Sequence, residues 1–187
     1  MKTSNFADAQ KAFVIKQSEE GTPGTEPILQ GARAFSRGVC RMLHRHDIFA
    51  VPEVPLRNGR RVDLMGLSKK GDVIIVEIKC ARGDLMGDTK WTEYLDYCDR
   101  FYWAVPSELH CQELYQERFL PERCGLIVAD AYDAEIARPA ALHALAASRR
   151  KVETLRIARH SMRRLLTLAD PALALDIPAA LTGNIVT

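Results

Sequence analysis

Two acidic residues and a lysine near the middle of the chain have the types and spacing of a site that binds a divalent cation. Asp63 lies in a predicted strand at 61–67, and Glu77-Ile78-Lys79 closes a second predicted strand at 73–79. The intervening residues 68–72 read Ser-Lys-Lys-Gly-Asp, a composition typical of a turn. The two strands are therefore predicted to form one antiparallel hairpin.

Pairing within this hairpin would bring the three side chains together. If residue 67 pairs with residue 73, Asp63 lies directly opposite Glu77, and Lys79 shares their face because side chains alternate along a strand. Opposed positions hold their Cβ atoms about 4.5–5.5 Å apart, and two carboxylates there repel each other unless a cation intervenes. Mg²⁺ or Mn²⁺ suits such ligands. A solvated strand face is the alternative, but the aliphatic run at 73–76 favours a central strand, where unused ionisable groups are costly.

The rest of the sequence supplies the elements that would position this hairpin. Helices are predicted from about 25 or 27 to 46, at 89–98, from Ser107, and at 146–169. Further strands are predicted at 48–56, 100–105, 126–129 and, as a short extended piece, 134–137, whereas 80–87 is expected to be a loop. This order is typical of an α/β domain with a mixed sheet covered by helices.

Several motifs carry a resemblance to a known family. They are Val-Pro-Glu-Val-Pro-Leu at 51–56, Gly-Arg-Arg-Val-Asp-Leu at 59–64, Ile-Val-Glu-Ile-Lys at 75–79, Asp-Thr-Lys-Trp-Thr-Glu-Tyr-Leu-Asp-Tyr-Cys-Asp-Arg-Phe at 88–101, Gly-Leu-Ile-Val-Ala-Asp at 125–130 and Arg-Arg-Lys at 149–151. Through them the chain resembles, over roughly 28–168, the MmcB-like bacterial DNA repair proteins of the PD-(D/E)xK nuclease superfamily. The resemblance implies a restriction-endonuclease-like mixed sheet with an αβββαβ core. It also implies that Asp63 and Glu77 are metal ligands and that Lys79 is the third catalytic residue.

The chain departs from the superfamily pattern at two places. Val62 stands where a proline usually precedes the first aspartate, and residues 28–46 contain no glutamate, although many members carry one in the first helix. Glu53 is a candidate replacement. A two-residue loop at Asn58-Gly59 would place Glu53 opposite Leu64 on the wrong face, and a three-residue loop ending at Arg60 would place it on the face of Asp63.

Lys79 and the residues after it are candidates for supporting roles. Two neighbouring carboxylates raise the pKa of a lysine, so Lys79 is predicted to act as a cation and not as a general base. Asp84, Lys90 and Tyr94 are candidate active-site support, because on an α-helix Lys90 and Tyr94 would share a face. Related nucleases often have Gln-x3-Tyr on the equivalent helix, and Lys90 could contact phosphate there. The alternative is that the aromatic residues pack on the sheet, which is favoured for Trp91.

The positive charge is concentrated near the C-terminal end. The net charge is only +2, yet between 149 and 164 seven basic residues face one acidic residue, Glu153. This helix is predicted to contact DNA phosphates, with a solvated basic face as the alternative. Val152, Leu155, Met162 and Leu166 are expected to form its core-facing stripe. The predicted phosphate contacts are Arg149, Arg150, Lys151, Arg156 and Arg163.

Length and composition fix the remaining expectations. The 187 residues fit one domain at 27–170, with a flexible tail at 1–26 and a second tail at 171–187. The chain shows neither a secretory h-region nor a membrane-spanning run, so a cytoplasmic protein without a membrane partner is expected. Five cysteines without a Cys-x-x-Cys pair argue against a zinc ribbon.

The expected function is DNA repair by a Mg²⁺- or Mn²⁺-dependent deoxyribonuclease. The alternative is a non-catalytic DNA- or partner-binding repair protein on a nuclease fold. DNA is the expected partner, and the sequence leaves open a homodimer and contacts with other repair proteins.

Overall fold

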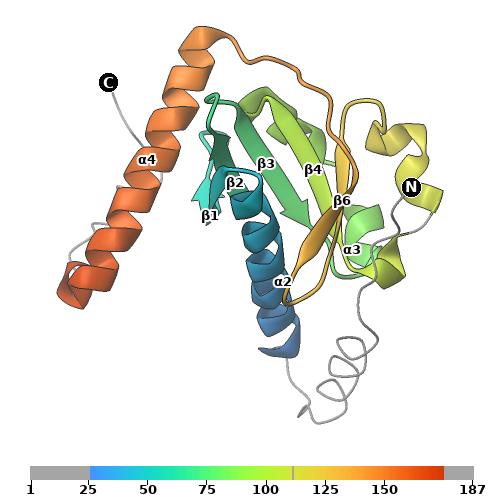
Figure 1. The fold of residues 1–187 in the computed structure, drawn as a ribbon, viewed down its shortest axis with the longest axis horizontal. Helices are drawn as coiled ribbons and strands as arrows, with labels where there is room; N and C mark the ends of the chain where they lie inside the picture. Colours follow the sequence, from blue (N-terminus) through green and yellow to red (C-terminus); the bar gives the residue numbers. More distant parts are fainter. Residues whose placement is uncertain (1–25, 111, 175–187) are drawn as a thin grey trace.

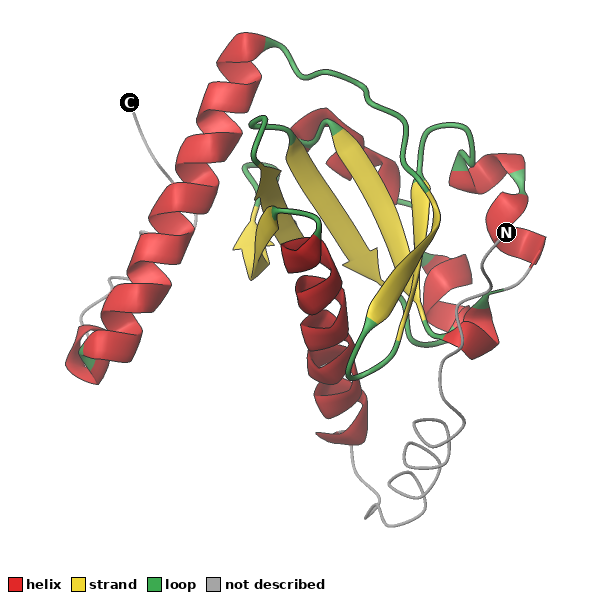
Figure 2. Cartoon of the chain, in the orientation of Figure 1, coloured by secondary structure: helices red, strands yellow, loops and turns green. Residues whose placement is uncertain are grey.

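The computed structural model describes residues 26–110 and 112–174. The predicted tail at 1–26, apart from Glu26, and the predicted tail at 171–187, apart from its first four residues, lie outside this range. The described residues form a mixed α/β fold, a six-stranded sheet with helices on both faces (Figures 1 and 2). No helix in these two segments has the length and apolar character needed to cross a bilayer.

The strands of the sheet lie side by side in chain order. β2 is antiparallel to both of its neighbours, β1 and β3. Strands β3, β4 and β5 run parallel, and β6 is antiparallel to β5. The predicted mixed sheet is therefore confirmed. Its strands are β1 (Ile48–Pro55), β2 (Arg61–Ser68), β3 (Val73–Ile78), β4 (Arg100–Val105), β5 (Gly125–Ala129) and β6 (Ala134–Arg138).

Each face of the sheet has its own apolar layer. Helix α2 (Glu26–Arg45) covers one face with Val39, Met42 and Leu43 (Figure 1). The helix comes close to the β5–β6 turn at Gly38, where a Cβ atom would collide with the carbonyl oxygen of Asp130. The close approach therefore requires glycine.

An aromatic cluster covers the opposite face. Trp91 and Trp103 pack edge to face with ring centroids 5.0 Å apart, and Phe101 and Phe119 contact Trp103. Packing was the favoured prediction for Trp91 and is confirmed by its burial. The elements on this side are α3 (Arg82–Gly87) and four short 3₁₀ helices, η1 (Trp91–Tyr97), η2 (Ser107–Leu109), η3 (Gln112–Tyr115) and η4 (Glu117–Phe119).

Three local predictions on this side are wrong. The expected loop at 80–87 contains the short helix α3, in spite of Gly83 and Gly87. The expected α-helix at 89–98 is the 3₁₀ helix η1, so its buried face follows a spacing of three residues. Ser107 does not cap an α-helix but begins a single 3₁₀ turn.

Helix α4 (Ala147–Ala169) lies beside the β1 edge of the sheet (Figure 1). Polar side chains of the helix face the sheet. Its buried residues are Glu153, Ile157 and His160. The predicted core-facing stripe of Val152, Leu155, Met162 and Leu166 is therefore wrong, because these side chains are 44–61% exposed. β1 is an edge strand, and its proline carbonyl oxygens at 52 and 55 accept hydrogen bonds from α4, which turns the polar side of the helix toward the sheet.

Asp99 connects the sheet to the start of α4. Its buried carboxylate accepts hydrogen bonds from the backbone N–H groups of Val73 and Leu145, each at 2.7 Å, and pairs with the guanidinium of Arg150 at 2.5 Å. Burial acts to raise the pKa of Asp99, but the hydrogen bonds from Arg150 and from the two backbone amides outweigh it and lower the pKa. The ionised carboxylate thus connects three segments that are far apart in sequence.

Replacing Asp99 by asparagine is expected to lower the free energy of unfolding by about 3 kcal/mol, because it leaves Arg150 without its anionic partner. The NH₂ group of the asparagine would also face the backbone N–H donors of Val73 or Leu145, to which it cannot act as an acceptor. Urea unfolding monitored by tryptophan fluorescence measures the change. Asp96→Asn, at an exposed position on η1, should stay within about 0.5 kcal/mol of wild type. Equal stabilities of the two variants would contradict the anchoring role of Asp99.

Candidate active site

The candidate site lies where β2 separates from β3. The predicted register is confirmed, since Leu67 pairs with Val73 and Leu64 with Val76. Backbone pairing between β2 and β3 ends at this pair. Beyond it, the Asp63 carboxylate accepts a hydrogen bond from the backbone N–H of Ile78 at 2.7 Å. β3 stays attached to β4 beyond this point. The Asp63 carboxylate is therefore held between two diverging strands.

Glu77 and Lys79 point from β3 toward the same side. Both side chains are buried, and the Lys79 Nζ atom lies 3.3 Å from Glu77 Oε1. Glu77 Oε2 is buried without a hydrogen-bond partner. Burial, followed by the charge of Asp63, raises the pKa of Glu77 to about 8. Burial also raises the pKa of Asp63, and its hydrogen bond from Ile78 opposes this effect. The two predicted ligands thus form a destabilised pair of carboxylates.

Lys79 is surrounded by further carboxylates. Its Nζ atom lies 2.9 Å from Asp88 Oδ2 and 3.6 Å from Asp84 Oδ1. Burial acts to lower the pKa of Lys79, but the hydrogen bond to Asp88 and the charges of Glu77, Asp88 and Asp84 raise it overall. Lys79 is therefore a cation at neutral pH.

Helix α3 brings the carboxylates of Asp84 and Asp88 to Lys79. Asp84 was a predicted support residue, and Asp88 is a site residue that the sequence analysis missed. The signal was the four-residue spacing of these two aspartates, which aligns side chains only if the segment is helical. Because 80–87 was expected to be a loop, that spacing was not used.

Glu53 lies across from Asp63 in the β1–β2 register. The neighbouring pairs are Pro52 with Leu64 and Val54 with Val62, and the hairpin loop consists of the three residues 57–59. The loop has three residues, as in the second alternative considered above, but it ends at Gly59 and not at Arg60. Glu53 has a positive φ of 61°, and its carboxylate pairs with Arg61 at 2.5 Å. Its charge still reaches Asp63, where it contributes to the raised pKa.

Tyr94 is buried beside the site, within reach of the charge of Glu77. The Tyr94 ring stacks on Phe101, and its hydroxyl lies 3.5 Å from the carbonyl oxygen of Arg61. Burial, followed by the charge of Glu77, raises the pKa of Tyr94 to about 12. Lys90 is exposed just before η1. The predicted shared face of Lys90 and Tyr94 is wrong, because it assumed α-helical geometry.

Four of the five predicted DNA-contacting residues have partners within the chain. Arg150 pairs with Asp99, and Arg156 binds Glu153 and the carbonyl oxygen of Pro55. Arg149 lies over the Tyr97 ring at 4.9 Å, and Arg163 lies 3.3 Å from His160 Nδ1. Lys151 is exposed. The helix therefore uses much of its positive charge to dock on the sheet, and its contact with DNA stays a prediction.

The donors present fit a hard divalent cation with an incomplete protein shell. Among residues 26–110 and 112–174, no three His, Cys, Asp or Glu side chains are gathered as a ready set of metal ligands. Asp63 and Glu77 provide two carboxylates, and Mg²⁺ is often held by one or two carboxylates with waters and substrate phosphates. The buried, unpartnered Glu77 Oε2 is the atom that such a cation would satisfy.

Fold and site together define an α/β protein with a buried acidic and lysine cluster at the end of a central strand. The family model described as DNA repair protein MmcB-like matches residues 26–172. The chain therefore belongs to the MmcB-like family of DNA repair proteins. Among solved structures it is similar to the SPO1766 protein of unknown function from Silicibacter pomeroyi, with 44% identity, 82% of this chain and 95% of that chain covered, and a TM-score of 0.66. No curated protein matches the chain.

In EDTA, Glu77→Gln is expected to raise the free energy of unfolding at pH 8. The pKa of Glu77 in the folded state, about 8, exceeds its ordinary value of 4.5. Between pH 4.5 and about 8 the folded state thus binds more protons than the unfolded state, and the free energy of unfolding of the wild type falls as the pH rises. The advantage of the variant should grow from pH 5 to pH 8, to at most about 5 kcal/mol at about 1.36 kcal/mol per pKa unit.

Urea unfolding at several pH values measures this difference. Glu135→Gln, at an exposed position on β6, is the control and should show no such pH-dependent advantage. A Glu77→Gln advantage of constant size from pH 5 to pH 8 would contradict the raised pKa of Glu77.

Proposed function

We propose that this DNA repair family member is a Mg²⁺- or Mn²⁺-dependent deoxyribonuclease of the PD-(D/E)xK superfamily. The observation that carries the proposal is the meeting of Asp63, Glu77 and Lys79 at the split between β2 and β3, with Glu77 Oε2 buried and unpartnered. The chain order α2, β1, β2, β3, α3, η1, β4 fits a restriction-endonuclease-like αβββαβ core in which α3 and η1 together stand for the second helix.

The residues of the site have distinct roles in this proposal. Asp63 and Glu77 hold the cation, which when bound polarises the phosphodiester and activates a water. Lys79 stays protonated and stabilises the negative charge that develops on the phosphate. Asp88 orients the Lys79 ammonium through the 2.9 Å contact.

Asp63→Ala is expected to abolish Mg²⁺ and Mn²⁺ binding in calorimetry and to reduce cleavage of labelled DNA at least about a hundredfold. Asp63→Asn, which keeps an acceptor for the Ile78 N–H, should behave in the same way, so a folding defect would not explain the loss. Glu135→Gln is the control. Single-stranded, duplex and branched DNA should each be offered. Metal binding and cleavage that survive in both Asp63 variants would contradict the assignment.

Asp88→Asn is expected to reduce the cleavage rate about tenfold while leaving the metal affinity unchanged, because it removes only the charge that orients Lys79. Asp84→Asn is the matched comparison. Its carboxylate is 58% exposed and lies farther from Nζ, at 3.6 Å, so it should have a smaller effect. Single-turnover cleavage gives the rates, and calorimetry gives the affinities. Equal losses in the two variants would contradict the positioning role of Asp88.

The second candidate function is DNA or partner binding without cleavage. It is favoured by the absence of a third metal ligand among residues 26–110 and 112–174, and by the three carboxylates that already surround the Lys79 ammonium. DNA binding that weakens with salt, without metal binding or cleavage in the experiment above, would establish this alternative.

A further inference from the structure

Helix α4 presents a long apolar face away from the sheet. The exposed fractions of its large apolar side chains run from 44% to 80%, unusually high for so many residues on one helix. Figure 1 shows the helix at the border of the described fold, with the sheet on one side only. The residues of this outer face are Val152, Leu155, Met162, Leu165 and Leu166, and Leu168 is exposed near the end of the helix.

The polar contacts of α4 fix this orientation. At the start of the helix, Arg150 is paired with the buried Asp99. In the middle, the fully buried Glu153 holds Arg156, and His160 Nε2 lies 3.2 Å from the carbonyl oxygen of Pro52. Rotating the helix to bury its apolar face would leave these charged groups buried without partners or expose the β1 carbonyls. The outer face must therefore be covered by something else or remain in water.

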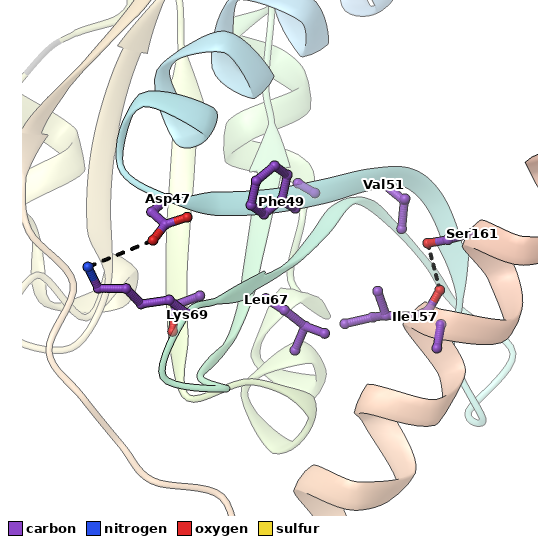
Figure 3. Close-up of a pocket in the computed structure, with 10 residues that line it drawn as sticks. Asp47, Phe49, Val51, Leu67, Lys69, Ile157 and Ser161 are labelled. Atoms are coloured by element: carbon purple, nitrogen blue, oxygen red, sulfur yellow. Dashed lines mark hydrogen bonds and ion pairs between the residues drawn. The ribbon is translucent and has the colours of Figure 1, made fainter.

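The outer face continues into an apolar cavity beside it. Figure 3 shows this cavity, which has a volume of about 420 Å³. It is lined by Phe49 and Val51 from β1, by Leu67 from β2 and by Ile157 from α4. Ala158 also lines it. Since Ala158 is three residues from Leu155 and four from Met162, the cavity and the outer face adjoin on the helix surface.

The chain after α4 begins at one end of this surface. The Asp170 N–H donates to the carbonyl oxygen of Leu166 and the Leu173 N–H to that of Asp170, which forms the 3₁₀ turn η5 (Pro171–Ala174) at the end of the helix. Residues 175–187 follow. When extended, they reach about 43 Å at roughly 3.3 Å per residue. The 23 residues of α4 are about 34 Å long at 1.5 Å per residue. The segment is therefore long enough to span the whole face.

The sequence of 175–187 has the pattern that such a surface requires. Asp176 is its only charged side chain. From 175 to 181 apolar residues occupy alternate positions, and in an extended chain alternate side chains lie on one side. Pro178, which lacks an N–H group, suits an extended segment without a strand partner. These residues are Leu175, Ile177, Ala179 and Leu181, and beyond Gly183 the apolar residues Ile185 and Val186 are adjacent.

We propose that residues 175–187 dock in extended form along the outer face of α4 and place apolar side chains at the cavity beside Ala158. The tether at Ala174 gives the segment an effective concentration in the millimolar range, which favours it over a second molecule. A second copy would be opposed by charge. Arg159 is exposed near the middle of the face, and a twofold pairing of two α4 helices centred there would bring two arginines together.

Hydrogen exchange of the full chain, measured by mass spectrometry at two protein concentrations, tests the proposal. The backbone amides of 175–187 should exchange at least about tenfold more slowly than in an unstructured peptide, equally at both concentrations. The double substitution Met162→Asp and Leu166→Asp should remove this protection and leave exchange in the sheet unchanged. Leu142→Asp, at a 52% exposed leucine outside the helix, is the matched control and should leave the segment protected.

Three results would overturn the proposal. The first is exchange of 175–187 at the unstructured rate in the wild-type protein. The second is protection that survives the double substitution, which would place the segment elsewhere. The third is protection that grows with concentration together with a dimer mass in light scattering, which would identify a second copy as the occupant of the face.

Discussion

The separation of β2 from β3 after the Leu64–Val76 pair is the constraint on which the candidate site depends. If the ladder continued, Asp63 and Glu77 would face each other as a directly paired couple of like charges, which destabilises a sheet. The strands instead part, and the Asp63 carboxylate satisfies the Ile78 N–H that the ladder leaves unpaired. The same event positions one predicted ligand and stabilises the end of the central strand.

The cost of this arrangement appears in the ionisation of the site. Glu77 is buried next to Asp63, and the raised pKa of both carboxyls shows that their charged forms are disfavoured in the folded protein. The positive charge of Lys79 offsets part of this cost. Its stabilising effect on Glu77 and Asp63 is limited, because the same ammonium also pairs with Asp88 and Asp84. A cluster that only stabilised the fold would be better served by apolar side chains of similar volume. The retained carboxylates are therefore explained more simply by a function that needs them.

The sequence predicted what alternation and turn composition determine, and it failed where tertiary contacts decide. The strands and the β2–β3 register followed from the aliphatic run at 73–76 and the turn at 68–72. Helix α3 was missed because Gly83 and Gly87 lower local helix propensity, and Asp88 was missed with it. The inner face of α4 could not be deduced. Periodicity shows that the helix has an apolar stripe, but it does not show whether the polar side makes stronger contacts with the sheet. These contacts are with the Pro52 and Pro55 carbonyl oxygens at the β1 edge, which attract the basic side of the helix.

The charges at the site also constrain how DNA could reach it. Glu77, Asp84 and Asp88 are three carboxylates around the single ammonium of Lys79, and Asp63 adds a fourth negative charge to the site. A phosphate brought to this surface would be repelled unless further positive charge came with it. Arg150 and Arg156 of α4 do not supply that charge, because they are already bound to Asp99 and Glu153 on the helix side of the fold. A divalent cation held by Asp63 and Glu77 would make the approach favourable and would satisfy Glu77 Oε2 at the same time. If DNA binds without a cation, it must therefore bind away from this cluster. The same divalent cation would thus decide both where DNA binds and whether it can be cleaved.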